Sequence, residues 1–184
     1  CSSDLYSEST SSGSFTFTTP NAGSGNGVSG GFTFHTGTSS AGNSGGYEFI
    51  TGRSGNGKGG FIAITVGSGT AGGGGSFSID AGDTLDSARG GDIHLLSGRS
   101  SKTSSGNMHL ITANAGVKGV SGAIQIMTGQ GTKETSGSIT INTGNAKGGK
   151  GGDLTLSVGA GDSGTGGDVS VTAGKTSDNA SGGA

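Results

Sequence analysis

The sequence predicts an all-β fold, a single β-solenoid of about 11 to 12 flattened coils with about 15 residues per coil, parallel stacked strands and a thin core. Two observations predict this class. An alternating pair of apolar residues recurs at a nearly constant spacing along the chain, and glycines flank each pair. Alternation with a period of two is typical of a strand, and a fixed spacing of this kind is typical of stacked repeats.

The first element of each repeat is a predicted strand that carries the apolar pair. The eleven pairs are Phe15/Phe17, Phe32/Phe34, Tyr47/Phe49, Ile62/Ile64, Phe77/Ile79, Ile93/Leu95, Met108/Leu110, Ile124/Ile126, Ile139/Ile141, Leu154/Leu156 and Val169/Val171. A glycine precedes every pair by two residues, and another follows by three residues in nine of the eleven repeats, with Pro20 and Ala113 as the exceptions. We expect these glycines to form the corners of each coil.

The second element of each repeat is a predicted extended segment that runs back along the coil. Seven positions after the first apolar residue, every repeat has Ala, Ser, Gly or Thr. We expect these small side chains to face the apolar pairs across the coil, which makes the core thin. One such coil buries too little apolar surface to offset its ordering entropy, so stacking on neighbouring coils has to supply the rest of the stability. An aromatic ladder of Phe15, Phe32 and Tyr47 would be part of that stacking.

A longer repeat is superimposed on the short one. The phrase GKGG at 57–60 recurs at 149–152, an offset of 92 residues, which is half of the chain length of 184. We therefore predict one continuous solenoid over 1–184, made of two six-coil super-repeats, 1–92 and 93–184. We see no capping repeat at the carboxyl end, and residues 1–12 resemble the closing part of a coil whose opening is missing. Since an open end exposes a strand edge that can pair with another chain, we expect either a segment of a longer array or two ends that complement one another between subunits.

Composition excludes several functional classes. Glycine is abundant, at 45 residues, but lacks the strict spacing and the proline of collagen. Ten Lys and Arg residues are scattered along a chain of net charge -2, which argues against nucleic acid as a partner, and no apolar run is long enough for a membrane span. The single cysteine, Cys1, cannot form an internal disulfide. No nucleophile, base and acid recur in one register, so we predict no enzymatic activity and no cofactor.

The pattern favours a structural repeat protein that forms a rod or a self-assembling extracellular filament by end-to-end coil stacking. The alternative is an ice-binding or polysaccharide-binding and surface-binding solenoid that uses a flat face rich in Thr and Ser. Its candidate residues are Thr16, Thr18, Thr140, Thr155 and Thr172. Only the first repeat has the Thr-x-Thr arrangement, and bulky or charged residues interrupt the middle of the face.

Other candidate sites lie on the outward positions. Leu96, Ile111 and Met127 form a predicted outward apolar column beside His94 and His109, which is a candidate lateral contact. The two histidines lack a third ligand in that column, so we predict no metal site. A further candidate is the glycosylation sequon at Asn179, and exposed hydroxyls make glycans possible partners besides other copies of the chain.

The phrases of the form [SG]-G-x-Φ-x-Φ-x-T-G, in which Φ is apolar, together with TANAG at 112–116 and SVGAG at 157–161, carry a family resemblance. They resemble glycine-rich tandem-repeat β-solenoid proteins predicted from diatom and brown-alga genomes. The resemblance covers nearly the whole chain. It implies an extracellular or cell-surface location and no assigned activity.

Overall fold

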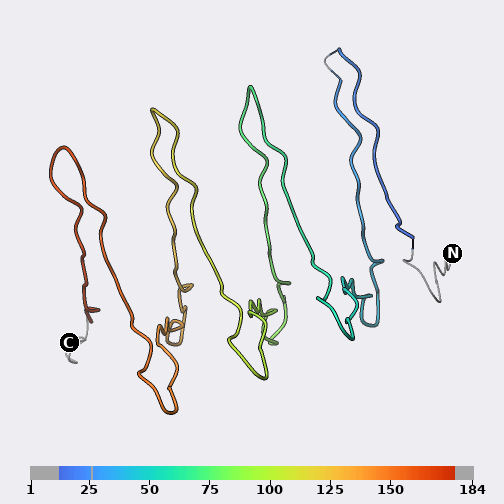
Figure 1. The fold of residues 1–184 in the computed structure, drawn as a ribbon. Coiled ribbons are helices and arrows are strands. Elements are labelled where there is room, and N and C mark those ends of the chain that lie inside the picture. The colour runs from blue at the N-terminus through green and yellow to red at the C-terminus, as the bar shows by residue number, and fades with distance from the viewer. Residues whose placement is uncertain (1–12, 26, 177–184) are drawn as a thin grey trace. The chain divides into compact units, whose positions relative to one another are not determined.

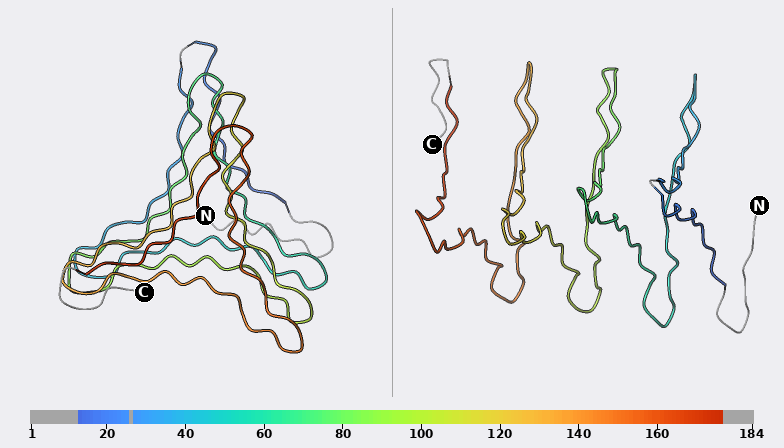
Figure 2. Two further views of the ribbon diagram at one scale, coloured as in Figure 1. Left: turned by 90° about the vertical axis from the view of Figure 1, so that its left-hand side faces the viewer. Right: turned by 90° about the horizontal axis from the view of Figure 1, so that it is seen from above.

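The computed structural model describes residues 13–25 and 27–176 as extended segments that alternate with short bends (Figure 1). These described residues contain no helix and no strand, so the prediction of an all-β solenoid is wrong. Ten bends or turns interrupt the extended chain at 24–25, 40–42, 55–57, 70–72, 85–88, 101–103, 117–118, 132–134, 147–149 and 162–165. Each bend is the tip of an open hairpin, in which the chain runs out, reverses and runs back, as Figures 1 and 2 together show.

Contacts divide the chain into two units, Cys1–Ile93 and His94–Ala184. Within each unit, successive hairpins extend in three different directions, and every fourth hairpin takes the direction of the first again (Figure 2). In the first unit the bends at 24–25 and 70–72 share a direction, and they are three repeats apart, with two other hairpins between them. One full turn of the chain therefore takes three repeats.

This arrangement explains why the solenoid prediction is wrong. One repeat was expected to close one coil, but in the structure it forms a single hairpin and covers one third of a turn. Consecutive repeats therefore point in different directions and do not stack on one another. A strand needs a ladder of hydrogen bonds to a neighbouring segment, and within the described chain the extended segments make only isolated bonds of this kind where hairpins close.

Main-chain hydrogen bonds lie mainly where a hairpin closes. The amide of Gly91 donates to the carbonyl of Gly82 at 2.9 Å, and the amide of Gly106 donates to the carbonyl of Gly98 at 2.9 Å. Gly75 donates to Gly67 in the same way at 3.3 Å. Most main-chain groups of the extended segments that the structure describes have no such partner, which leaves a polar backbone open to other chains.

Each repeat has a small residue seven positions after the first residue of its apolar pair. In the ten repeats whose bend is described, this residue lies one or two positions before the bend, at the hairpin tip, and not opposite the apolar pair. The hydroxyl of Ser39 accepts a hydrogen bond from the amide of Gly42, and Ser54 accepts one from Gly57, both at 2.9 Å. Ser100 accepts from the amide of Thr103 at the same distance. A hydroxyl that bonds the backbone two or three residues on stabilises a turn, so these residues close the bends.

The thin core is absent as well. In the described part of the chain no residue is buried, whether apolar or polar. The chain exposes 18575 Å² of surface, whereas a compact monomer of its mass exposes about 7,800 Å². A single chain thus keeps its apolar side chains in water.

Candidate functional site

The feature that recurs in every repeat is the apolar pair, and the structure places it at the junction between hairpins. The pair Ile62/Ile64, for example, lies midway between the bends at 55–57 and 70–72. The three hairpin directions of a unit meet at these junctions (Figure 2). All 22 side chains of the pairs remain between 50% and 92% exposed, from Ile139 to Val171. The pairs therefore form an apolar surface that a single chain leaves uncovered.

The first three repeats connect their pairs through aromatic contacts. The rings of Phe15 and Phe17 are 4.5 Å apart and perpendicular, at 89°, and Phe17 contacts Phe32 of the next repeat at 5.6 Å. The series continues through Phe34, which lies 5.6 Å from Tyr47. These edge-to-face and tilted geometries are favourable for aromatic pairs. They join consecutive repeats around the turn, which differs from the stacked ladder that the sequence predicted.

A glycine at the base of each hairpin allows the two sides to approach. We call the glycine two residues before each apolar pair the base glycine. A Cβ added to Gly75 would lie 2.6 Å from Cγ1 of Val66, and one added to Gly167 would lie 2.8 Å from Cγ1 of Val158. At Gly60 it would lie 3.0 Å from Cβ of Thr51. The residue that ends the preceding extended segment therefore crowds a Cβ at these three base glycines, whereas at Gly30, Gly45 and Gly152 the nearest atom would lie at an ordinary contact distance of 3.5 to 3.7 Å.

The glycine three residues after each pair, which we call the loop glycine, has a different environment. A Cβ added to Gly67 or Gly159 would meet nothing within 4 Å. This open space fits the presence of Pro20 and Ala113 at the same position in two repeats. Neither class of glycine has a positive φ. Among the described residues only Gly148 and Gly164 do, at 77° and 76°, and both lie at hairpin tips. The bends of the described chain fall at these tips and not at the flanking glycines, contrary to the expectation that these glycines form corners.

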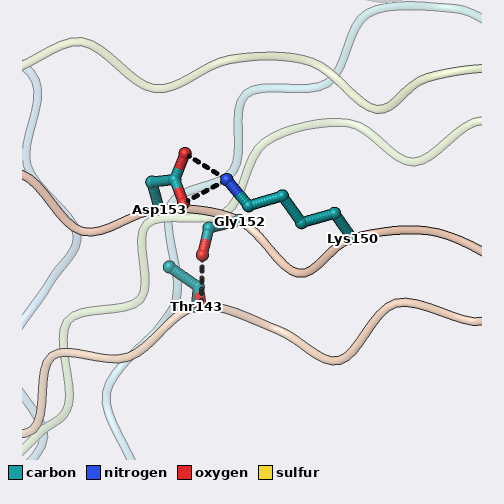
Figure 3. A network of polar contacts seen from close by, with 4 residues as sticks. All are labelled: Thr143, Lys150, Gly152 and Asp153. Carbon is teal, nitrogen blue, oxygen red and sulfur yellow. Dashed lines mark hydrogen bonds and ion pairs between the residues drawn. The ribbon is translucent and has the colours of Figure 1, made fainter.

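Polar contacts reinforce the hairpin base around Gly152 (Figure 3). The hydroxyl of Thr143 donates to the carbonyl of Gly152 at 3.1 Å. On the other side of this glycine, Lys150 pairs with Asp153 at 2.9 Å, and both side chains are largely exposed. Arg89 and Asp92 form the equivalent pair at 2.6 Å. Exposed pairs contribute about 0 to 1 kcal/mol, so these contacts orient the base and add little stability.

The residues of the predicted lateral contact stand in three consecutive repeats. Leu96 is 94% exposed, Met127 is 80% exposed and Ile111 is 78% exposed, so no contact within the chain buries them. His94 and His109 precede two of them in the sequence. Within the described residues no three His, Cys, Asp or Glu side chains lie close enough together to hold a metal ion. Consecutive repeats point in different directions within their unit (Figure 2), so the stacked column that the sequence predicted loses its basis, and a lateral contact through these residues stays an untested prediction.

The structure bears on the predicted flat face but not on the glycosylation sequon. Thr140, Thr155 and Thr172 belong to consecutive repeats, whose hairpins point in different directions within their unit (Figure 2). The flat face was derived from stacked coils and loses that basis. Thr16 and Thr18 are exposed. Asn179 and Cys1 lie outside the described residues.

Sequence reasoning missed apolar residues at or near the hairpin tips. Leu85 and Val117 lie within bends and are fully exposed, and Val120 is 94% exposed. Phe61, directly after a base glycine, is 86% exposed. The signal for Leu85 and Val117 was an apolar residue inside the polar, glycine-rich stretch between two pairs. These residues extend the uncovered apolar surface from the junctions out to the tips.

Comparisons with protein-family models, curated proteins and solved structures gave no match to the chain. The described residues include no helix of the length and apolar character that crossing a membrane requires.

Proposed function

We propose that this protein is a structural repeat protein that assembles with other copies of itself, and that assembly covers its apolar pairs. The observation that carries the proposal is the exposure of all 22 paired side chains, each at least 50% exposed. Burial of apolar side chains is the main force that orders a chain, at roughly 1.5 to 3 kcal/mol for each large side chain. No described residue is buried within one chain, so an ordered array of hairpins requires burial of its apolar side chains against another molecule.

The exposed area is large enough to support assembly. The chain exposes 18575 Å², which is about 10,800 Å² more than a compact monomer of this mass. A standard stable interface buries only about 800 Å² on each partner. The surplus thus exceeds what one ordinary binding partner covers, and it extends along the whole chain.

The repeat itself indicates which partner fits. A surface whose apolar pairs recur at a nearly constant spacing matches a partner with the same spacing, and another copy of this chain has it. The net charge of -2 is small, so copies repel one another weakly. This assembly differs from end-to-end coil stacking, because the described chain forms no closed coils that could stack. A location outside the cell and the lack of enzymatic activity remain predictions.

Sedimentation velocity over a dilution series tests the proposal. The wild-type chain should sediment as an assembly at micromolar concentration and dissociate on dilution. Replacing Ile124 and Ile126 together with serine removes one apolar pair and should raise the concentration of half-assembly by about 100-fold or more. Gln125→Ser, between the two, is the matched control and should assemble as the wild type does. A chain that sediments as a monomer at every concentration would refute the proposal.

A further inference from the structure

We infer that three copies of the chain interleave around a common axis, so that each hairpin lies between hairpins of the other two copies. The inference rests on the proposed function, and it specifies the number of copies and their register. It follows from the number of hairpins in a turn, from the similarity of the repeats and from the surfaces that stay open between hairpins of one direction.

Within a unit, hairpins take three directions in succession, and the direction of the bend at 24–25 returns at 70–72 (Figure 2). Advancing by one repeat therefore corresponds to one third of a turn. All repeats share one pattern, so a second copy rotated by one third of a turn presents an equivalent hairpin in every direction. A third copy, rotated by two thirds, does the same and completes the set.

Hairpins that share a direction leave apolar surfaces uncovered between them. Three repeats separate Phe15 from Ile62, and these side chains are 68% and 58% exposed. The two intervening repeats of the same chain point elsewhere, so the chain itself leaves two positions unfilled in each direction. Two additional copies fill both. A single additional copy would leave one position open, and its apolar pairs would stay in water.

The interleaved arrangement imposes one register between the copies. Each hairpin of one copy meets the next hairpin along the sequence of a second copy. Phe15 of one copy then lies beside Phe32 of a second, Tyr47 of the third and Ile62 of the first again. Apolar pairs thus cover apolar pairs, and neighbouring extended segments can satisfy the open main-chain groups of one another.

The hairpin tips of the first unit provide a test of this register. Ala41 and Asn56 are the middle residues of the bends at 40–42 and 55–57, and Ser87 lies in the bend at 85–88. Interleaving places Ala41 of one copy beside Asn56 of another, because their hairpins are consecutive. Ser87 belongs to the third hairpin after that of Ala41. These two hairpins share a direction but lie one full turn apart (Figure 2).

The experiment uses single-cysteine variants of the full chain, each also carrying Cys1→Ser, that are mixed in pairs, refolded together and treated with a short thiol cross-linker. We expect Ala41→Cys to cross-link with Asn56→Cys at least tenfold more than with itself or with Ser87→Cys. Native mass spectrometry of each variant should give three times the 17.3 kDa of one chain, as for the wild type, which shows that the variants still assemble.

The outcomes separate this inference from the proposed function. An assembly with another number of copies would overturn the interleaved trimer and leave self-assembly intact, as would equal cross-linking of Ala41→Cys to itself and to Asn56→Cys. A chain that stays monomeric in the wild type would overturn both. Three copies with the Ala41 to Asn56 cross-link would support both.

Discussion

Replacing Gly167 with alanine should weaken the hairpin base, whereas the same replacement at Gly159 should not. Gly167 is a base glycine, and a Cβ there would lie 2.8 Å from Cγ1 of Val158. Gly159 is the loop glycine of the same hairpin, and a Cβ there would meet nothing within 4 Å. Neither residue has a positive φ, so the backbone accepts alanine equally at both positions.

The expected magnitudes have opposite signs. Valine has a stiff χ1, so its methyl group cannot yield without a change of rotamer or a shift of the backbone. Crowding of this kind costs about 1 to 3 kcal/mol. At Gly159 alanine reduces only the freedom of the unfolded chain, which stabilises by about 0.4 to 1 kcal/mol. The two variants should therefore differ by about 1.5 to 4 kcal/mol in the free energy of unfolding per chain.

Guanidinium unfolding at a fixed chain concentration, followed by circular dichroism, measures this difference. A double variant that combines Gly167→Ala with Val158→Ala separates crowding from other effects, because the smaller side chain removes the clash. It should lose less stability than the sum of the two single replacements. Equal midpoints for Gly167→Ala and Gly159→Ala would refute the explanation given for the base glycine.

Three further predictions concern the hairpin tips and the forces of assembly. Gly148 has a φ of 77° with open space around it, so Gly148→Ala should lower the free energy of unfolding by about 1 to 2 kcal/mol in a denaturant titration. Gly149→Ala, at an ordinary φ, should cost less, and equal losses would contradict the conformational reason. Ser54→Ala removes the acceptor for the amide of Gly57 and should speed hydrogen exchange there, whereas Ser54→Asp should keep it slow. Sodium sulfate should strengthen assembly, and moderate sodium chloride should leave it nearly unchanged, because apolar burial dominates; dissociation by sodium chloride in light scattering would point to ion pairing instead.

The sequence allowed the repeat to be located but not its path in space. The spacing of pairs such as Ile62/Ile64 and Phe77/Ile79 marks the repeat correctly, and the alternation matches extended chain. Alternation with a period of two describes an extended segment alone, however. It does not determine whether one repeat closes a coil or forms one third of a turn, because that depends on the direction in which each junction points the next hairpin.

Two local features show how far the pattern could be interpreted. The small residue at the tip was expected to face the apolar pair, but the spacing of Ser39 to Gly42 and of Ser54 to Gly57 is also typical of a hydroxyl that closes a turn. The invariance of the base glycine was visible in the sequence, whereas its cause was not. The structure shows a close approach across the hairpin at some of these glycines, such as that of Val66 to Gly75, but ordinary contact distances at others, such as Gly45 and Gly152.

The measurement that tests the central claim most directly is hydrogen exchange of the wild-type chain at assembling and at highly dilute concentrations. The claim is that copies of the chain cover the extended segments that a single copy leaves open. Peptides around Ile124/Ile126 should therefore exchange at least 100-fold more slowly when the chain is concentrated, and quickly when it is dilute. Rapid exchange of these segments at every concentration would contradict the claim, because it would mean that nothing covers them.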